Sequence, residues 1–263
     1  MSQKGRNKTN VKRRQRKIRN SWMLVAGLLL LGALFAVTKC DILHLRDRTP
    51  ARIPDGYNAF CIDISHHNGI VRDWDGLRIH VKADGTFAAS EAEAAVTYPV
   101  TMIYMKATEG VSLRDRHFPD QWQEARKRSF SVGAYHFFLS DKDPKLQAQN
   151  YIRTVGPLRE RDLAPVLDVE RIHKGCTRDQ LNSAVRIWLT EVESYYGKKP
   201  IIYTSDHFAR RMLAPDLIAG YRIWVAHYGV SAPDLQGWSL WQFTERGVVD
   251  GIQGFVDISV EHN

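Results

Sequence analysis

Residues 163–170 read LAPVLDVE, a short apolar run that ends in two acidic residues, Asp168 and Glu170, on either side of Val169. Side chains two positions apart on a strand lie on the same face, so both carboxylates are expected to point into one small space. Leu167 and Val169 would then fill the opposite face. Neighbouring carboxylates raise one another's pKa, and burial raises it further. The stretch therefore predicts a buried strand that ends in a functional pair of acids.

Runs with strand character recur on both sides of this stretch. Strands are predicted at residues 58–65, 101–107 and 131–138 before it, and at 200–205, 221–228, 238–244 and 254–259 after it. Helices are predicted at about 116–129, 144–155 and 177–196, with a short one after residue 205. The last three strands are separated by loops too short for full helices. Residues 79–100, rich in Ala and Glu, are a predicted insertion of unassigned role.

The alternation of strands and helices predicts a parallel sheet, and eight strands in this order favour a closed barrel. The predicted fold class is therefore α/β: a TIM-like irregular (β/α)5(β)3 barrel preceded by one transmembrane helix. An open, doubly wound sheet is the alternative, but no Gly-rich phosphate loop follows the first strand. The 263 residues are ample for a sizeable core.

The positive charge is concentrated at the N-terminus. Residues 1–20 carry nine Lys/Arg and no acid, whereas the rest of the chain carries 28 basic and 29 acidic residues, so a nucleic-acid-binding face is not supported. Residues 22–38 are uniformly apolar and long enough to cross a lipid bilayer. The positive-inside rule then predicts a cytoplasmic tail (1–20), a signal-anchor helix (21–40), a tether (41–57) and a domain (58–263) on the periplasmic or cell-wall side. A cleaved signal peptide is the alternative.

The cysteines and histidines give no sign of a metal site. Cys40, Cys61 and Cys176 have no ligand spacing. An exported domain permits a disulfide, but an odd count leaves one thiol over, and a pairing of Cys61 with Cys176 stays open. His66 and His67 are adjacent and would point in opposite directions on a strand. No metal and no cofactor is expected.

The strand ends collect the residues that carry chemistry, as the carboxyl ends of barrel strands do. Besides Asp168 and Glu170, these ends bring the following side chains: Asp63, Lys106, Tyr135, His136, Tyr203 and Asp257. Four carboxylates would converge there, and one of them would stay protonated near neutral pH. Such a group can act as the general acid that glycosidic bond cleavage requires. The alternatives are a salt-bridged barrel layer or a solvated strand end for the pair, and turn or cap residues for the other two acids.

Aromatic residues lie on or near the same strand ends: Tyr135, Tyr203, Trp224, Tyr228, Trp241 and Phe243. Sugars present apolar C–H faces, so a groove with Trp and Tyr suits them. Core packing is the alternative for each of these residues taken singly. Trp188, on the apolar face of a predicted helix, is expected in the core. His136 is interpreted either as a donor to substrate or as a buried barrel histidine.

Eight motifs in order resemble those of the glycoside hydrolase family 25 lysozymes, the Chalaropsis-type N-acetylmuramidases: CIDISHHNG, YMKATEG, GAYHFF, APVLDVE, PIIYTS, IWVAHY, LWQFT and GFVDIS. The resemblance spans about residues 57–261. It implies a barrel of five strand–helix units followed by three strands. It also implies cleavage of the β-1,4 bond between N-acetylmuramic acid and N-acetylglucosamine, so that the partner is the glycan strand of peptidoglycan.

The resemblance also implies site residues. Glu170 would be the general acid/base, and Asp168 would assist the substrate's 2-acetamido group. The remaining acids would hold substrate and tune proton affinities. The predicted catalytic residues are Glu170, Asp168 and Asp63, and the predicted substrate-binding residues are Asp257, Tyr135, Tyr203, Lys106 and Trp241.

Two positions depart from the family pattern: Cys61 stands where members usually carry Gly, and Asn68 where they usually carry Gln. Neither change removes a carboxylate. A spacing of two residues on a strand suits either glycosidase geometry, so retention and inversion both stay open. The alternative functions are a non-catalytic peptidoglycan-binding barrel and a chitinase-like hydrolase. The presence of all four acids favours an enzyme over a pure binder. Chitinase-like enzymes typically carry a longer acidic signature on this strand, whereas LAPVLDVE has only the last two acids.

Overall fold

The computed structural model describes residues 50–262. The predicted tail (1–20) and signal-anchor helix (21–40) lie outside this range, as do residues 41–49 of the predicted tether. Within residues 50–262, no helix combines the length and apolarity that a membrane crossing requires.

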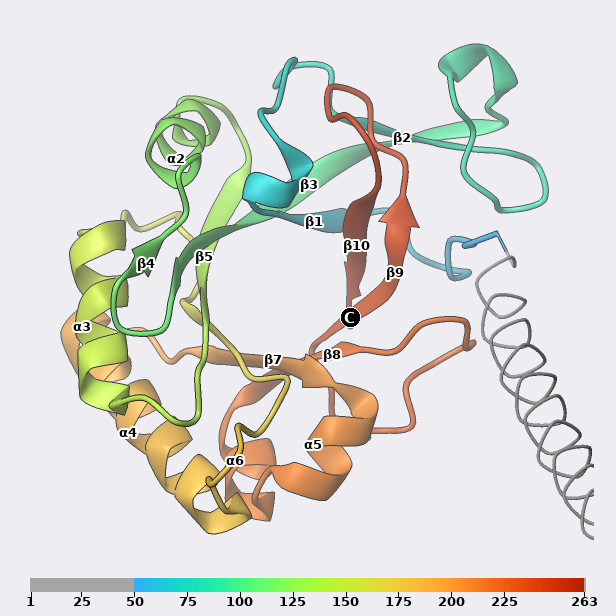
Figure 1. Ribbon diagram of the computed structural model, residues 1–263. Coiled ribbons are helices and arrows are strands. Elements are labelled where there is room, and N and C mark those ends of the chain that lie inside the picture. Colours follow the sequence, from blue (N-terminus) through green and yellow to red (C-terminus); the bar gives the residue numbers. More distant parts are fainter. Residues whose placement is uncertain (1–49, 263) are drawn as a thin grey trace, which may run out of the picture. The chain divides into compact units, whose positions relative to one another are not determined.

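Eight strands close into a barrel in the order β1, β3, β5, β6, β7, β8, β9, β10, with β10 pairing back onto β1 (Figure 1). Their bounds are Phe60–Ile64, Val96–Glu109, Ser131–Phe137, Val166–Asp168, Ile201–Ser205, Arg222–Ala226, Leu240–Gly247 and Val256–Glu261. Every predicted strand is therefore found, and the stretch that carries the acid pair becomes β6. The predicted irregular eight-stranded α/β barrel is confirmed.

One strand departs from the parallel arrangement that was predicted. Each pair of neighbouring barrel strands from β1 to β9 is parallel. Strand β10, in contrast, is antiparallel to both of its neighbours, β9 and β1. The short loop between β9 and β10 explains this, because a parallel return needs a crossover of a dozen or more residues. Asp257 consequently lies near the start of β10, where it pairs with Asp63 on β1.

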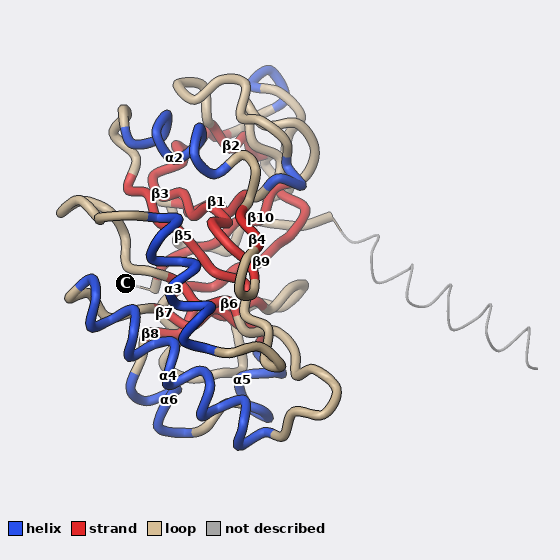
Figure 2. Tube along the Cα trace, turned by 60° about the vertical axis from the view of Figure 1, so that its left-hand side comes forward, coloured by secondary structure: helices blue, strands red, loops and turns tan. Residues whose placement is uncertain are grey.

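The helices pack outside the barrel (Figure 2). Their bounds are Phe118–Arg126 (α2), Pro144–Val155 (α3), Arg178–Tyr196 (α4), Asp206–Met212 (α5) and Pro215–Gly220 (α6). The start of α3 is fixed by Asp143, whose side chain accepts from two backbone N–H groups of the first turn. The start of α4 is fixed by a capping box of Thr177 and Gln180. Trp188 on α4 is fully buried, as predicted.

The outward-facing and inward-facing side chains of the barrel strands belong to two separate hydrophobic clusters. Leu167 and Val169 of the β6 segment point outward into the large core beneath the helices. A smaller cluster fills the barrel interior: Cys61, Tyr104, Val166, Ile201, Tyr203, Trp224, Ala226 and Leu240. Gly133 on β5 makes room there, because a Cβ atom on it would lie 2.1 Å from Cε1 of Tyr104. The barrel is therefore closed below its mouth by packed side chains.

The predicted insertion at 79–100 extends one strand beyond the barrel. Strand β2 (Arg78–Val81) pairs antiparallel with the first residues of β3, which is 14 residues long, and the short 3-10 helix η2 (Glu91–Glu93) lies between them. His80 of β2 is buried, with Nδ1 2.8 Å from Thr97 Oγ1 on β3 and Nε2 2.8 Å from Asp250 Oδ2. The contact with Asp250 attaches the hairpin to the loop between β9 and β10.

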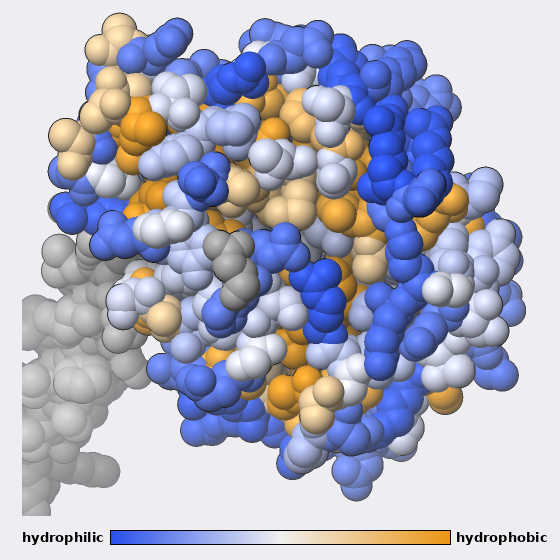
Figure 3. Space-filling view, turned by 180° about the vertical axis from the view of Figure 1, so that it is seen from behind, coloured by the Kyte–Doolittle hydropathy of each residue, from blue (hydrophilic) through white to orange (hydrophobic). Residues whose placement is uncertain are grey.

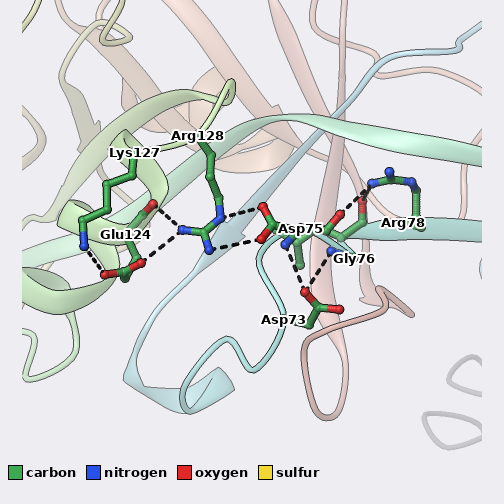
Figure 4. A network of polar contacts seen from close by, with 8 residues as sticks. Asp73, Asp75, Gly76, Arg78, Glu124, Lys127 and Arg128 are labelled. Atoms are coloured by element: carbon green, nitrogen blue, oxygen red, sulfur yellow. Dashed lines mark hydrogen bonds and ion pairs between the residues drawn. The ribbon is translucent and has the colours of Figure 1, made fainter.

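An ion network on the surface joins the loop before β2 to α2 (Figure 4). Arg128 binds Asp75 at 2.9 Å and Glu124 at 3.1 Å, and Lys127 binds Glu124 at 2.5 Å. Asp73 accepts from the backbone N–H groups of Asp75 and Gly76 and shapes the turn. Exposed pairs of this kind contribute little stability, so their effect is mainly to fix the loop. Figure 3 shows, from behind, a surface on which apolar side chains are interspersed with hydrophilic ones.

Candidate active site

Seven of the eight sequence-predicted site residues are brought together at one end of the barrel: Asp63, Lys106, Tyr135, Asp168, Glu170, Tyr203 and Asp257. They come from different strands, and their charges act on one another. The pKa of Tyr135 is raised by burial and then by Asp63, Asp168 and Asp257. The pKa of Tyr203 is raised by burial, by Tyr228 and then by Asp63, Asp168 and Glu170.

Asp168 and Glu170 sit at different depths. Asp168 is 6% exposed, and its Oδ1 has no hydrogen-bond partner among the described residues. Burial raises the pKa of Asp168 well above its ordinary value, and the charge of Glu170 raises it further. Glu170 follows the strand and is exposed at the mouth, where partial burial raises its pKa against the opposing effect of Arg171 and Lys106. One acid is thus buried with a free oxygen and the other faces solvent.

Asp63 and Asp257 form a second carboxyl pair. Their Cα atoms are partners across β1 and β10, and their side chains are hydrogen-bonded. Burial raises the pKa of Asp63 well above its ordinary value, and Asp257 raises it further. Burial likewise raises the pKa of Asp257, to about 6. A hydrogen bond between two carboxyl groups requires a proton on one of them, so the two side chains share a proton in this arrangement.

Gln242 on β9 is a site residue that the sequence interpretation did not single out. It is fully buried, and its Nε2 donates to Asp63 Oδ1 at 2.8 Å. Its Oε1 accepts from the hydroxyls of Tyr203 at 2.8 Å and Tyr228 at 2.5 Å. The alternation along the strand places Gln242 on the same face as Leu240, and the structure shows that this face points inward.

Lys106 supplies a buried positive charge beside the acids. It is 8% exposed, its Nζ binds Glu109 Oε2 at 2.7 Å, and it lies 4.9 Å from the centre of the Phe137 ring. Its charge opposes the rise in the pKa of Asp168 and of Glu170. Lys106 therefore favours the charged form of both Asp168 and Glu170.

An open cleft of about 570 Å³ begins at Glu170 and runs over β7, β8 and the end of β9. It is lined by Glu170, Tyr203, Ser205, Asp206, His207, Arg210, Ala226, His227, Tyr228 and Glu245. Tyr228 is 41% exposed on this wall. The cleft thus offers aromatic and hydrogen-bonding groups to a polar ligand beside the exposed acid.

One group of three possible metal ligands lies at the edge of the cleft. Oxygen or nitrogen atoms of Asp206, His227 and Asp234 lie within 4.8 Å of one another. Arg210 already binds both carboxylates, with Nε 2.7 Å from Asp206 and Nη2 3.1 Å from Asp234. Because this guanidinium supplies the positive charge that the two carboxylates need, the donor set does not fit a cation in the arrangement seen.

Two aromatic expectations need correction. Trp241 is 2% exposed and packs in the outer core with Phe243, and its indole N–H donates to the His227 carbonyl at 2.8 Å. It does not line the site, because Leu240 and Gln242 take the inward positions. His136 also faces outward: it is fully buried, contacts Thr108 and Gln147 by hydrogen bonds, and stacks on Trp188. It is neither a substrate donor nor a side chain of the barrel interior.

The cysteines do not form a disulfide with each other. Cys61 lies buried inside the barrel and Cys176 lies in the loop before α4, and both are free thiols. Cys40 lies outside the described residues. The Cys61 thiol stays protonated, because burial raises its pKa well above its ordinary value and Asp63 raises it further.

Comparison with known proteins shows the family to which this barrel and its acidic residues belong. The sequence pattern of "Glycosyl hydrolases family 25" matches residues 62–252, a range that runs from the middle of β1 to beyond the end of β9. The chain belongs to glycosyl hydrolases family 25. The predicted glycoside hydrolase of the lysozyme type is thereby confirmed at the level of the family. Asp63, Asp168 and Glu170 all fall within the matched range.

Three relatives illustrate the similarity. The chain is 34% identical over 263 residues to the uncharacterized protein YegX of Escherichia coli (strain K12), covering 93% of this chain and 90% of that protein. It is 28% identical over 210 residues to Lysozyme M1 of Streptomyces globisporus, covering 74% of this chain and 65% of that protein. The crystal structure of the bacterial lysozyme from Streptomyces coelicolor superposes with a TM-score of 0.66 at 26% identity, covering 80% of this chain and 94% of that one.

Proposed function

We propose that this family 25 enzyme is a lysozyme that hydrolyses the β-1,4 bond between N-acetylmuramic acid and N-acetylglucosamine in peptidoglycan. The observation that carries the proposal is the difference in burial between Asp168 and Glu170. A solvent-facing acid with a raised pKa stands at an open cleft, and a buried acid with a free oxygen stands beside it. Relatives named as lysozymes support the substrate class.

Glu170 is the general acid/base of the proposed reaction. Its raised pKa keeps a proton available, and that proton goes to the glycosidic oxygen as the bond from this oxygen to the anomeric carbon breaks. The resulting carboxylate then takes a proton from the water that completes hydrolysis. The surrounding acids stabilise the positive charge that develops on the sugar ring.

Asp168 is the partner of the substrate's 2-acetamido group. Its free Oδ1 accepts a hydrogen bond from the acetamido N–H. This contact orients the acetamido oxygen for attack on the anomeric carbon, in place of an enzyme nucleophile. Two successive displacements at one carbon give a product that retains its configuration. Asp63 and Asp257 hold the sugar and, through their shared proton, limit the negative charge beside it.

We further propose that residues 22–38 anchor the enzyme in the cytoplasmic membrane, with the barrel on the periplasmic or cell-wall side. The support is the sequence: a uniformly apolar segment behind nine basic residues. The full-length protein should then stay in the membrane pellet after alkaline carbonate washing. Release into the supernatant would overturn the anchor without touching the catalytic proposal.

The identity of the product tests the substrate assignment. Purified peptidoglycan is digested with the full-length protein, the new reducing ends are reduced with borohydride, and the reduced sugar is identified by mass spectrometry. N-acetylmuramic acid at the new end is the expected result. N-acetylglucosamine at that end would contradict the proposal, and cleavage of chitin oligomers in place of peptidoglycan would support the chitinase-like alternative. Binding without turnover would support the non-catalytic barrel.

A further inference from the structure

Gln242 connects two groups of residues that otherwise have separate places in the site. Its amide oxygen is occupied by the hydroxyls of Tyr203 and Tyr228, which belong to the wall of the cleft. Its amide nitrogen points the other way and donates to Asp63. Because the oxygen side of the amide accepts two hydroxyls, the N–H side is left for the carboxylate. One buried side chain therefore spans from the cleft wall to the carboxyl pair.

The position of Gln242 in the barrel explains why this contact is rigid. On β9 its Cα pairs with Ala226 of β8 and with Ser259 of β10, so the residue is held by strands on both sides. Its side chain is completely shielded from solvent. A buried glutamine whose oxygen and nitrogen are both bonded cannot rotate without losing all three bonds. Asp63 is thus held from β9 by Gln242 and from β10 by Asp257.

We propose that Gln242 is the positioning residue that couples the aromatic wall of the cleft to the Asp63–Asp257 pair and holds the Asp63 carboxyl in place within that pair. A sugar seated against Tyr228 then meets a carboxyl pair of fixed geometry. This inference rests on the proposed function for its meaning in catalysis, but the coupling itself is a property of the folded protein and is measured without substrate.

The other groups that act on the titration of Asp63 come from the strands around it. The carboxyls of Asp257 on β10 and of Glu170 after β6 raise the pKa of Asp63. The charge of Asp63 in turn raises the pKa of these neighbours: Asp168, Tyr135, Tyr203, Tyr228 and Cys61. Glu170 acts on Asp63 through charge alone, and Asp257 through both charge and a hydrogen bond. Gln242 is the neutral donor in this set, so its removal isolates the effect of a hydrogen bond on the carboxyl pair.

Two variants of Gln242 separate the two ends of the amide. Gln242→Met keeps the length of the side chain and removes all three hydrogen bonds. Gln242→Glu keeps an acceptor for Tyr203 and Tyr228 and replaces the donor to Asp63 with a second carboxyl group. Gln123→Met, at an exposed position of α2, is the matched control. All are made in the full-length protein, and circular dichroism confirms the fold before titration.

The main readout is the titration of the aspartate side-chain carboxyls, labelled with carbon-13 and followed by NMR, with resonances assigned from single Asp→Asn variants. Hydrogen bonds to charged groups contribute about 1.5–3 kcal/mol, or about 10- to 150-fold in an equilibrium constant. Both Gln242 variants should therefore lower the acid dissociation constant of Asp63 at least ~10-fold. The acid limb of the pH profile of kcat/KM should move to higher pH by the same factor. The control should titrate as the wild type does.

The outcomes separate this inference from the proposed function. Wild-type titration of Asp63 in Gln242→Glu would overturn the positioning role, even if Gln242→Met failed to fold. A shifted titration with an unshifted pH profile of kcat/KM would also overturn it, because the pair would then be uncoupled from the reaction. If the wild type cleaves no peptidoglycan, the proposed function fails, and the carboxyl titration still decides whether Gln242 controls the pair.

Discussion

The carboxyl pair at the barrel mouth makes the stability of this enzyme depend on pH in a defined direction. The pKa of Asp257 is about 6, against 3.8 for an ordinary aspartate, because burial disfavours its charged form. Each tenfold change in proton affinity corresponds to about 1.4 kcal/mol. Ionisation of this one carboxyl therefore costs the folded protein about 3 kcal/mol.

The sign of the effect follows from the proton balance. Between about pH 4 and pH 6 the folded protein keeps a proton on Asp257 that the unfolded chain has lost. The free energy of unfolding therefore decreases as the pH rises through this window, and the cost is complete above about pH 6. Asp257→Asn has nearly the same shape and cannot ionise. Its free energy of unfolding should equal that of the wild type below about pH 4 and exceed it by about 3 kcal/mol above pH 6.

Urea unfolding of the full-length protein, followed by tryptophan fluorescence between about pH 4 and pH 8, measures this difference. Asp84→Asn is the control of opposite sign. Asp84 is exposed, and its pKa is lowered by hydrogen bonds from Thr86, so this variant should gain nothing as the pH rises. A difference between Asp257→Asn and wild type that stays constant over the whole range would refute the reasoning.

Two further predictions concern the packing around the site. Gly133→Ala should lower the free energy of unfolding by about 1–3 kcal/mol, because its Cβ would meet the Tyr104 ring, whereas Gly220→Ala has nothing within 4 Å and should keep the wild-type midpoint in calorimetry. An unshifted midpoint in Gly133→Ala would contradict the packed barrel interior. Trp241→Ala should cost about 3–5 kcal/mol and leave the KM of the folded fraction for peptidoglycan unchanged, since the indole is buried in the outer core. A stable variant with a raised KM would instead place Trp241 in the binding site.

The alternation of inward-facing and outward-facing side chains along each strand made much of the fold and of the site predictable. Alternation in LAPVLDVE placed Leu167 outward and Asp168 inward, and the structure has both so. The same alternation, followed through LWQFT, would have placed Gln242 inside and Trp241 outside. The affinity of tryptophan for sugars predicted a binding role for Trp241, but the alternation along the strand is what decides which side chain enters the site.

Features that depend on long-range pairing were beyond the sequence. The direction of β10 is set by its pairing with β1 and β9, and a single strand carries no local signal of its direction. The hairpin of β2 with β3 likewise depends on residues that meet across the 79–100 insertion. His136 was ambiguous because a histidine with three buried neighbours, Thr108, Gln147 and Trp188, reads in sequence like any polar residue on a strand.

The depth difference between Asp168 and Glu170 was also invisible in the sequence. Both residues share a face, but β6 ends at Asp168, so Glu170 extends beyond the strand to the solvent. The depth of each carboxyl decides its proton affinity. The structure therefore supports different roles for two acids that the sequence presents as equivalent.

The central claim is that Glu170 supplies the proton in glycosidic bond cleavage, and one rate comparison tests it directly. Release of reducing ends from purified peptidoglycan is measured for the full-length wild type, for Glu170→Gln, and for Glu160→Gln, a control at an exposed position away from the cleft. Glu170→Gln should lose at least ~10²-fold in kcat, as expected for loss of a general acid, while Glu160→Gln should match the wild type. Equal turnover by Glu170→Gln and the wild type would contradict the account.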